Sequence, residues 1–192
     1  MPKLSELAIS PWRGLSESEV RRVVGVTSNL VSKLAFVTDW RLQKAYYLAE
    51  VWSIEERLSR LSVADFASWT HGPWSLHVRE AAEILEAKGT LKRTKQRAKR
   101  RSEAEFLKVV KTDQLADLGE KDEEFLESLS RQMRYLSGEK LTEIAKGTPP
   151  YVATKRGQRI DLDAYLESIK RKHEELASSP RAAALIAEAK AE

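Results

Sequence analysis

The sequence predicts a mainly α-helical protein: a compact helical domain that carries a small two-stranded β ribbon. Apolar residues recur every three or four positions through most of the 192-residue chain, which is the pattern of helices that bury one face. Serine, threonine or aspartate precedes several of these segments and can cap the first turn of a helix. One segment rich in lysine and arginine has no apolar stripe, and there we predict the ribbon.

Composition restricts the class of protein. Hydrophobic residues make up 42% of the chain and charged residues 32%, which is typical of a globular domain. There is no cysteine, which excludes a disulfide framework and a thiolate zinc site. No apolar run approaches the ~20 residues needed to cross a membrane, and the N-terminal MPKLSELAIS lacks the pattern of a secretory signal. We therefore expect a cytoplasmic protein that does not contact a membrane.

We expect three parts along the chain: an N-terminal arm over residues 1–15, a helical domain over residues 16–172, and a C-terminal helical tail over residues 173–192. The domain opens with a capping box that starts at Ser16 and precedes an apolar stripe over residues 20–34. The tail is rich in alanine, the strongest helix former.

The central element is predicted to be a helix over residues 40–57. Apolar residues cover most of its circumference, Tyr46 and Trp52 among them, so most of its sides should be buried. Thr38 or Asp39 can cap its first turn. We expect other helices to surround it.

A short extended segment follows and ends at a sharp turn formed by Gly72 and Pro73. Glycine permits backbone angles that other residues avoid, and proline suits the first turn of a helix. We therefore expect Pro73 to open the next helix. Phe66 and Trp69 are expected in the core, whereas the sequence favours neither burial nor exposure for Trp74.

The ribbon is predicted from two segments, residues 90–96 and 106–112, on either side of a basic loop. Between residues 88 and 101 there are eight basic and no acidic side chains, so the rest of the chain carries a net charge of −4 although the whole chain is +4. A helix over residues 96–110 is the alternative, and the missing apolar stripe argues against it.

Three helices are expected after the ribbon. Asp122 can cap the first, Ser137 the second, and Asp161 the third, which should span residues 162–172.

Four segments of the chain together resemble a known family. They are LQKAYYLAEVW (residues 42–52), FASWTHGP (66–73), SGEKLTEI (137–144) and PPY (149–151). In order and spacing they resemble the Panacea domain, the SocA-like antitoxin domain, over roughly residues 38–168. The chain departs from the family pattern at Ala145 and Lys146, where the family has threonine and histidine, and at Trp74, where it has valine.

The resemblance implies a prokaryotic or phage antitoxin from a two-gene toxin–antitoxin system. Panacea-domain proteins neutralise a cognate toxin, the product of the adjacent gene, by binding it directly. One branch of the family acts as an adaptor that delivers its toxin to a Clp-type protease, and this is one alternative function for the chain.

Two surfaces are candidates for binding. Exposed tryptophan and tyrosine often anchor protein interfaces, which gives the partner-binding candidates Trp69, His71, Gly72, Pro73, Trp74 and Tyr151. The basic segment can contact nucleic acid or an acidic partner through Lys92, Arg93, Lys95, Arg97, Lys99, Arg100 and Arg101. A winged-helix-like DNA-binding regulator that uses residues 88–101 is therefore the second alternative function.

No pattern in the sequence predicts an enzyme, a metal site or a cofactor. His71 and His77 flank the turn, with Asp65 and Glu80 nearby, but their spacing matches no standard zinc site. We expect surface or capping histidines instead. The chain has neither a nucleophile elbow nor a glycine-rich phosphate loop. The sequence leaves open whether the protein forms homo-oligomers.

Overall fold

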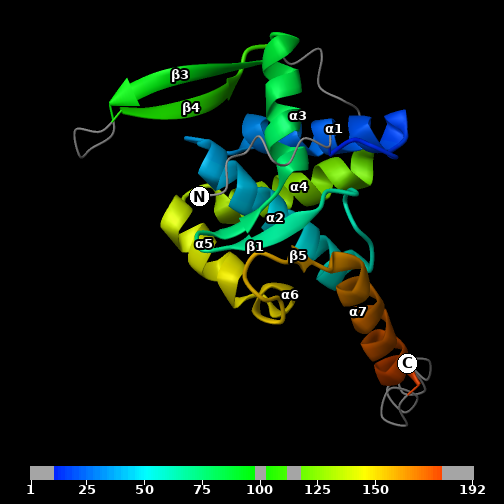
Figure 1. The fold of residues 1–192 in the computed structure, drawn as a ribbon. Helices are drawn as coiled ribbons and strands as arrows, with labels where there is room; N and C mark the ends of the chain where they lie inside the picture. Colours follow the sequence, from blue (N-terminus) through cyan, green and yellow to red (C-terminus); the bar gives the residue numbers. More distant parts are fainter. Residues whose placement is uncertain (1–10, 98–102, 112–117, 179–192) are drawn as a thin grey trace, which may run out of the picture.

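The computed structural model describes residues 11–97, 103–111 and 118–178. In chain order the elements are α1 (Glu17–Lys33), α2 (Asp39–Arg57), β1 (Phe66–Trp69), β2 (Gly72–Trp74), α3 (Leu76–Ala87), β3 (Leu91–Arg97), β4 (Glu103–Val109), α4 (Glu120–Met133), α5 (Gly138–Gly147), α6 (Pro149–Val152), β5 (Arg159–Ile160) and α7 (Leu162–Ala177). Figure 1 shows α2 within the body of the molecule, from which the β3–β4 ribbon and α7 project. The predicted mainly α fold with a β ribbon is confirmed.

The first two helices form the centre of the core. Ser16 begins α1 with a complete capping box, as predicted. Thr38 begins α2 by accepting a hydrogen bond from the Arg41 N–H. Tyr46 and Tyr47 of α2 are fully buried, and α1, α3, α4, α5 and α7 all contact this helix. The predicted central helix is confirmed, and its apolar circumference is explained by neighbours on most sides.

Strands β2, β1 and β5 form a three-stranded antiparallel sheet in that order. Pro73 pairs with Ser68 inside this sheet, so the prediction that it opens a helix is wrong; α3 begins at Leu76. Along β1 burial alternates, with Phe66 buried and Trp69 37% exposed. The predicted core position of Trp69 is wrong because residues three apart on a strand lie on opposite faces.

The predicted β ribbon is present, and the alternative helix is wrong. Strands β3 and β4 pair in antiparallel register along their whole length. The segment before α2 extends this pairing, because the Leu107 N–H donates to the Val37 carbonyl at 2.7 Å. Three of the predicted basic residues, Lys99, Arg100 and Arg101, lie outside the described residues.

Asp122 has a different role from the one predicted. Helix α4 begins after Gly119, so Asp122 does not cap it. Its carboxylate instead binds Arg22 of α1 at 2.5 Å and Arg57 of α2 at 2.6 Å. This carboxylate therefore joins three helices that are distant in the sequence.

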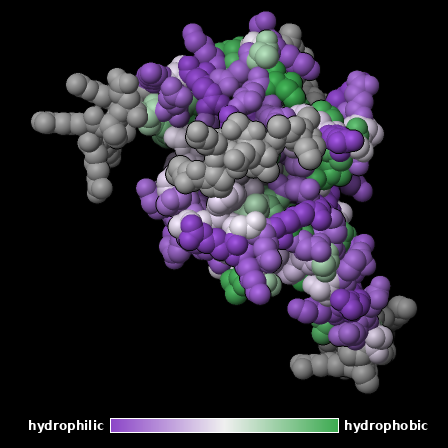
Figure 2. Space-filling view, in the orientation of Figure 1, coloured by the Kyte–Doolittle hydropathy of each residue, from purple (hydrophilic) through white to green (hydrophobic). Residues whose placement is uncertain are grey.

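The C-terminal helices begin where the sequence predicts. Ser137 caps α5 and Asp161 caps α7. Helix α7 runs to Ala177, five residues beyond the expected end, and its last residues belong to the stretch predicted as a separate tail. Within the described ranges no helix combines the length and apolar character that a membrane span requires. Figure 2 shows hydrophilic side chains over most of the visible face, with hydrophobic ones in small separate groups.

Candidate partner-binding site at the glycine-proline corner

The turn from β1 into β2, residues 69–74, forms what we call the glycine-proline corner. Gly72 has φ +90°, a backbone conformation that L side chains rarely adopt. A Cβ atom at this position would lie 3.2 Å from Cε of Lys44 and 3.3 Å from Cγ2 of Thr142. Glycine therefore allows the corner to sit directly against α2 and α5.

Two consecutive polar residues of α2 hold the corner. The Gln43 side-chain amide donates to the Ser75 carbonyl at 2.9 Å and accepts from the Ser75 N–H at 2.7 Å. The Lys44 ammonium donates to the Pro73 carbonyl at 2.8 Å. Both side chains are buried, each with 2% exposure. Because these contacts are to backbone atoms, they fix the path of the chain through the corner.

The charge on Lys44 is unusually buried. Its Nζ lies 5.8 Å from the ring centroid of Trp40 and 6.0 Å from that of Trp74, which are cation–π distances. Burial, together with the nearby charge of Lys146, lowers the pKa of Lys44 to about 8. At neutral pH the ammonium is still mostly charged, so the two rings and one carbonyl replace its water shell.

The outward side of the corner presents aromatic rings. Trp69 is 37% exposed and Trp40 is 44% exposed. The Trp40 ring lies 5.6 Å from the His71 ring, and its Nε1–H donates to the Thr142 hydroxyl at 2.9 Å. The Tyr151 hydroxyl donates to the Trp69 carbonyl at 2.7 Å. The rings are therefore positioned by contacts from α5 and α6.

The six predicted partner-binding residues lie close together along the corner but differ in exposure. Trp69 and His71 are exposed, Gly72 and Pro73 are buried, and Trp74 and Tyr151 are half-buried. Sequence reasoning missed Trp40, Gln43 and Lys44 as parts of this site. The available signal was two adjacent polar residues inside a helix that is apolar on most sides.

The basic side chains of β3 differ in whether a carboxylate binds them. Arg93 is bound by the carboxylates of Asp39 and Glu86, and together these hydrogen bonds raise its pKa. Its charge therefore serves to attach the ribbon to α2 and α3. Lys92 and Lys95 are exposed. Arg97 ends β3.

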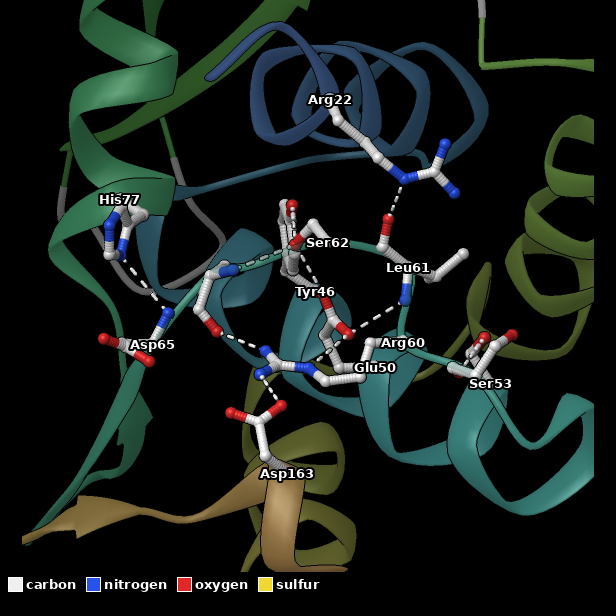
Figure 3. A network of polar contacts seen from close by, with 12 residues as sticks. Arg22, Tyr46, Glu50, Ser53, Arg60, Leu61, Ser62, Asp65, His77 and Asp163 are labelled. Carbon is white, nitrogen blue, oxygen red and sulfur yellow. Dashed lines mark hydrogen bonds and ion pairs between the residues drawn. The ribbon is translucent and has the colours of Figure 1, made fainter. Parts of the chain in front are cut away.

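A buried carboxylate, that of Glu50 in α2, binds the loop before β1 (Figure 3). Glu50 has no exposed surface, and burial raises its pKa although Arg60 opposes that shift. Its oxygens accept from the Leu61 N–H at 3.1 Å, the Ser62 hydroxyl and Arg60. Arg60 continues to Asp163 of α7 at 3.0 Å. The carboxylate therefore anchors the loop before β1 and the start of α7.

His77 uses both of its ring nitrogens in contacts with the backbone. His77 accepts a hydrogen bond from the Asp65 N–H at Nδ1, at 3.2 Å, and its Nε2 is 2.9 Å from the Pro11 carbonyl. Both ring nitrogens are thus used in holding the chain before α1 and the loop before β1. In the described ranges no three histidine, aspartate or glutamate side chains come together as metal ligands would.

More than half of the chain matches the model of a known protein family. The model of the family "Antitoxin SocA-like, Panacea domain" matches residues 42–150. The chain belongs to this family. The matched region starts just before Gln43 and Lys44 and includes the glycine-proline corner, so the contacts of these two side chains with the corner lie inside it. Trp40 and Tyr151 lie just outside the matched residues. No curated protein and no solved structure matches the chain.

Membership of an antitoxin family agrees with the earlier expectation and implies a toxin as partner. It also suggests a role other than catalysis.

Proposed function

We propose that this Panacea-domain chain is an antitoxin that neutralises its cognate toxin, the product of an adjacent gene, by direct protein–protein binding. The observation that carries the proposal is the family match over residues 42–150. The aromatic surface of the glycine-proline corner supplies the physical means, because tryptophan side chains are the commonest anchors of protein interfaces.

The construction of the corner suits this function. Gln43 and Lys44 fix the backbone from below, while Trp40 and Trp69 remain partly exposed above it. A surface that is already ordered loses little conformational entropy on binding. We propose that the toxin contacts Trp69 and His71 and is held inactive by steric masking.

Co-purification tests this proposal. Each adjacent gene product is co-expressed with the chain and analysed by size-exclusion chromatography. The double variant Trp69→Ala/His71→Ala should lose co-elution, with affinity reduced about 30-fold or more, as expected for anchor residues. Leu176→Ser, which removes an apolar side chain that is 67% exposed on α7, is the control and should co-elute normally. Unchanged binding by the double variant would place the interface elsewhere.

A DNA-binding regulator is the second candidate, favoured by the ribbon that projects from the body of the molecule (Figure 1). Lys92, Lys95 and Lys108 are exposed on it and are able to reach phosphates. Gel shifts with duplex DNA at several salt concentrations decide this: binding through phosphates weakens steeply as salt rises. No shift at physiological salt would remove this candidate.

The adaptor function makes a separate prediction. If the chain delivers its toxin to a Clp-type protease, the toxin should disappear faster when the chain is present. A toxin level that stays constant after synthesis is stopped would argue against delivery.

A further inference from the structure

A second surface feature adjoins the corner: a groove of about 490 Å³ between the α1–α2 connection and the α4–α5 connection. Three aromatic residues line it with high exposure, Phe36 at 73%, Trp40 at 44% and Tyr135 at 89%. Trp40 also contacts His71 of the corner, so the two surfaces are continuous. Apolar side chains this exposed are typical of interaction sites when they cluster.

Phe36 has a backbone conformation that needs an explanation. Its φ is +53°, in the left-handed region that non-glycine residues seldom occupy. The ring gains little burial in return; it packs edge-on against Phe106 at 6.3 Å and otherwise faces solvent. Strained backbone that presents an exposed ring does not serve stability, and such strain concentrates at binding sites.

The floor of the groove is preformed. Arg41 is 6% exposed and lines the groove. Its guanidinium donates to the carbonyls of Ala35, of Met133 at 2.9 Å and of Arg134 at 2.8 Å. One side chain thus joins the two connections that form the walls, and a preformed groove avoids the cost of ordering on binding.

Cationic side chains gather next to the groove, whose lining also includes one carboxylate, that of Glu139. Lys92 and Lys108 are directly opposite one another in the ribbon register, and both are exposed. In the part of the chain that the structure describes, neither makes an ion pair. Like charges directly across a strand pair are unfavourable. Lys108 shares a strand face with Phe106, which packs on Phe36, and Arg134 adds a third exposed cation at the groove.

We propose that this groove and the adjacent ribbon face bind an acidic amphipathic segment of the toxin, in which an aromatic or aliphatic side chain is flanked by carboxylates. The apolar anchor enters beside Phe36, Trp40 and Tyr135, and the carboxylates meet Lys92 and Lys108. The inference rests on the proposed antitoxin function for the identity of the partner. A partner that bound by phosphate alone would use the lysines and leave the aromatic groove empty.

A displayed library of random 12-residue peptides, selected on the full-length chain, tests the groove without the toxin. Enriched peptides should combine aspartate or glutamate with an aromatic or large aliphatic residue. Phe36→Asn/Tyr135→Ser should lose this enrichment at least 10-fold, because asparagine tolerates the left-handed backbone and both replaced side chains are exposed. The control Val152→Ser removes a 70%-exposed apolar side chain elsewhere and should retain it. Enrichment that is absent, or equal in the double variant, overturns the inference.

The variant Lys108→Glu tests whether the bound segment is acidic. This variant should bind the selected peptides at least 10-fold more weakly, and raising the salt concentration should weaken the wild type in the same way. Unchanged affinity would contradict the acidic character of the partner. In toxin co-expression, rescue by both the wild type and Phe36→Asn/Tyr135→Ser would overturn the groove while the antitoxin function stands. If the wild type does not rescue, the antitoxin function fails, and the peptide selection still decides the groove.

Discussion

Replacing Gly72 by alanine tests the packing of the glycine-proline corner. An alanine at this position must keep the backbone angle φ +90°, which costs about 1 to 3 kcal/mol of strain. Its Cβ would also lie 3.2 Å from the Lys44 side chain and 3.3 Å from Thr142, so these side chains must give way by a few tenths of an ångström. Overpacking a closely packed site of this kind costs about 1 to 3 kcal/mol.

The strain and packing contributions can be separated with a control. Gly14 has a similar φ of +85°, but a Cβ there would have nothing within 4 Å. Gly14→Ala should therefore show the strain alone, and Gly72→Ala should lower the free energy of unfolding by a further ~1 to 3 kcal/mol through overpacking. Urea denaturation followed by circular dichroism measures both. Equal losses in the two variants would refute the argument that Lys44 and Thr142 require glycine at the corner.

Three further predictions follow from charged residues. Burial lowers the Lys44 pKa from 10.5 to about 8, so between these pH values the unfolded chain binds more protons than the folded chain. The free energy of unfolding should therefore rise by about 2 kcal/mol between pH 7 and 9.5. Lys44→Met should lose this rise. A wild type without the rise would contradict the burial of a charged lysine. Asp122→Asn should lower the free energy of unfolding by about 1.5 to 3 kcal/mol because two arginines lose a carboxylate. Glu127→Gln, whose ion pairs are more exposed, should cost less than Asp122→Asn, and equal costs would argue against the Asp122 junction. Lys108→Glu should stabilise the ribbon by about 0.5 kcal/mol through a pair with Lys92, and a lower thermal midpoint would refute this.

Local sequence signals predicted the starts of three helices correctly. Ser16, Ser137 and Asp161 each cap a helix where the sequence placed the cap, because a cap involves residues only two or three positions away. The ribbon was predicted for a similar reason: the absence of an apolar stripe is visible within one segment. The family resemblance agreed with the matched residues 42–150.

The prediction for Asp122 failed because its partners are distant in the sequence, whereas the prediction for Pro73 failed on a local contact. Pro73 pairs with Ser68 of β1, five residues before it, and the proline was predicted to start a helix instead of forming this hairpin. Asp122 does not cap α4 because its carboxylate pairs with Arg22 and Arg57, which lie more than 60 residues before it. No local pattern reveals such contacts.

The candidate site was predicted only in part, for the same physical reason. The aromatic corner could be found from residue types, and Trp69 and His71 are exposed on it. Gln43 and Lys44 could not be assigned, since their function is to bind backbone atoms about 30 residues away. The groove at Phe36 joins connections that are about 100 residues apart.

Growth rescue tests the central claim, that this chain neutralises a toxin by binding it. Each adjacent gene is induced alone and then together with the wild-type chain, and growth is followed while the proteins are co-purified. The account predicts that one neighbour stops growth, and that the chain restores it and co-elutes with that neighbour as a stable complex. If no neighbour is toxic, or if growth returns without any complex, direct neutralisation is wrong for this member of the family.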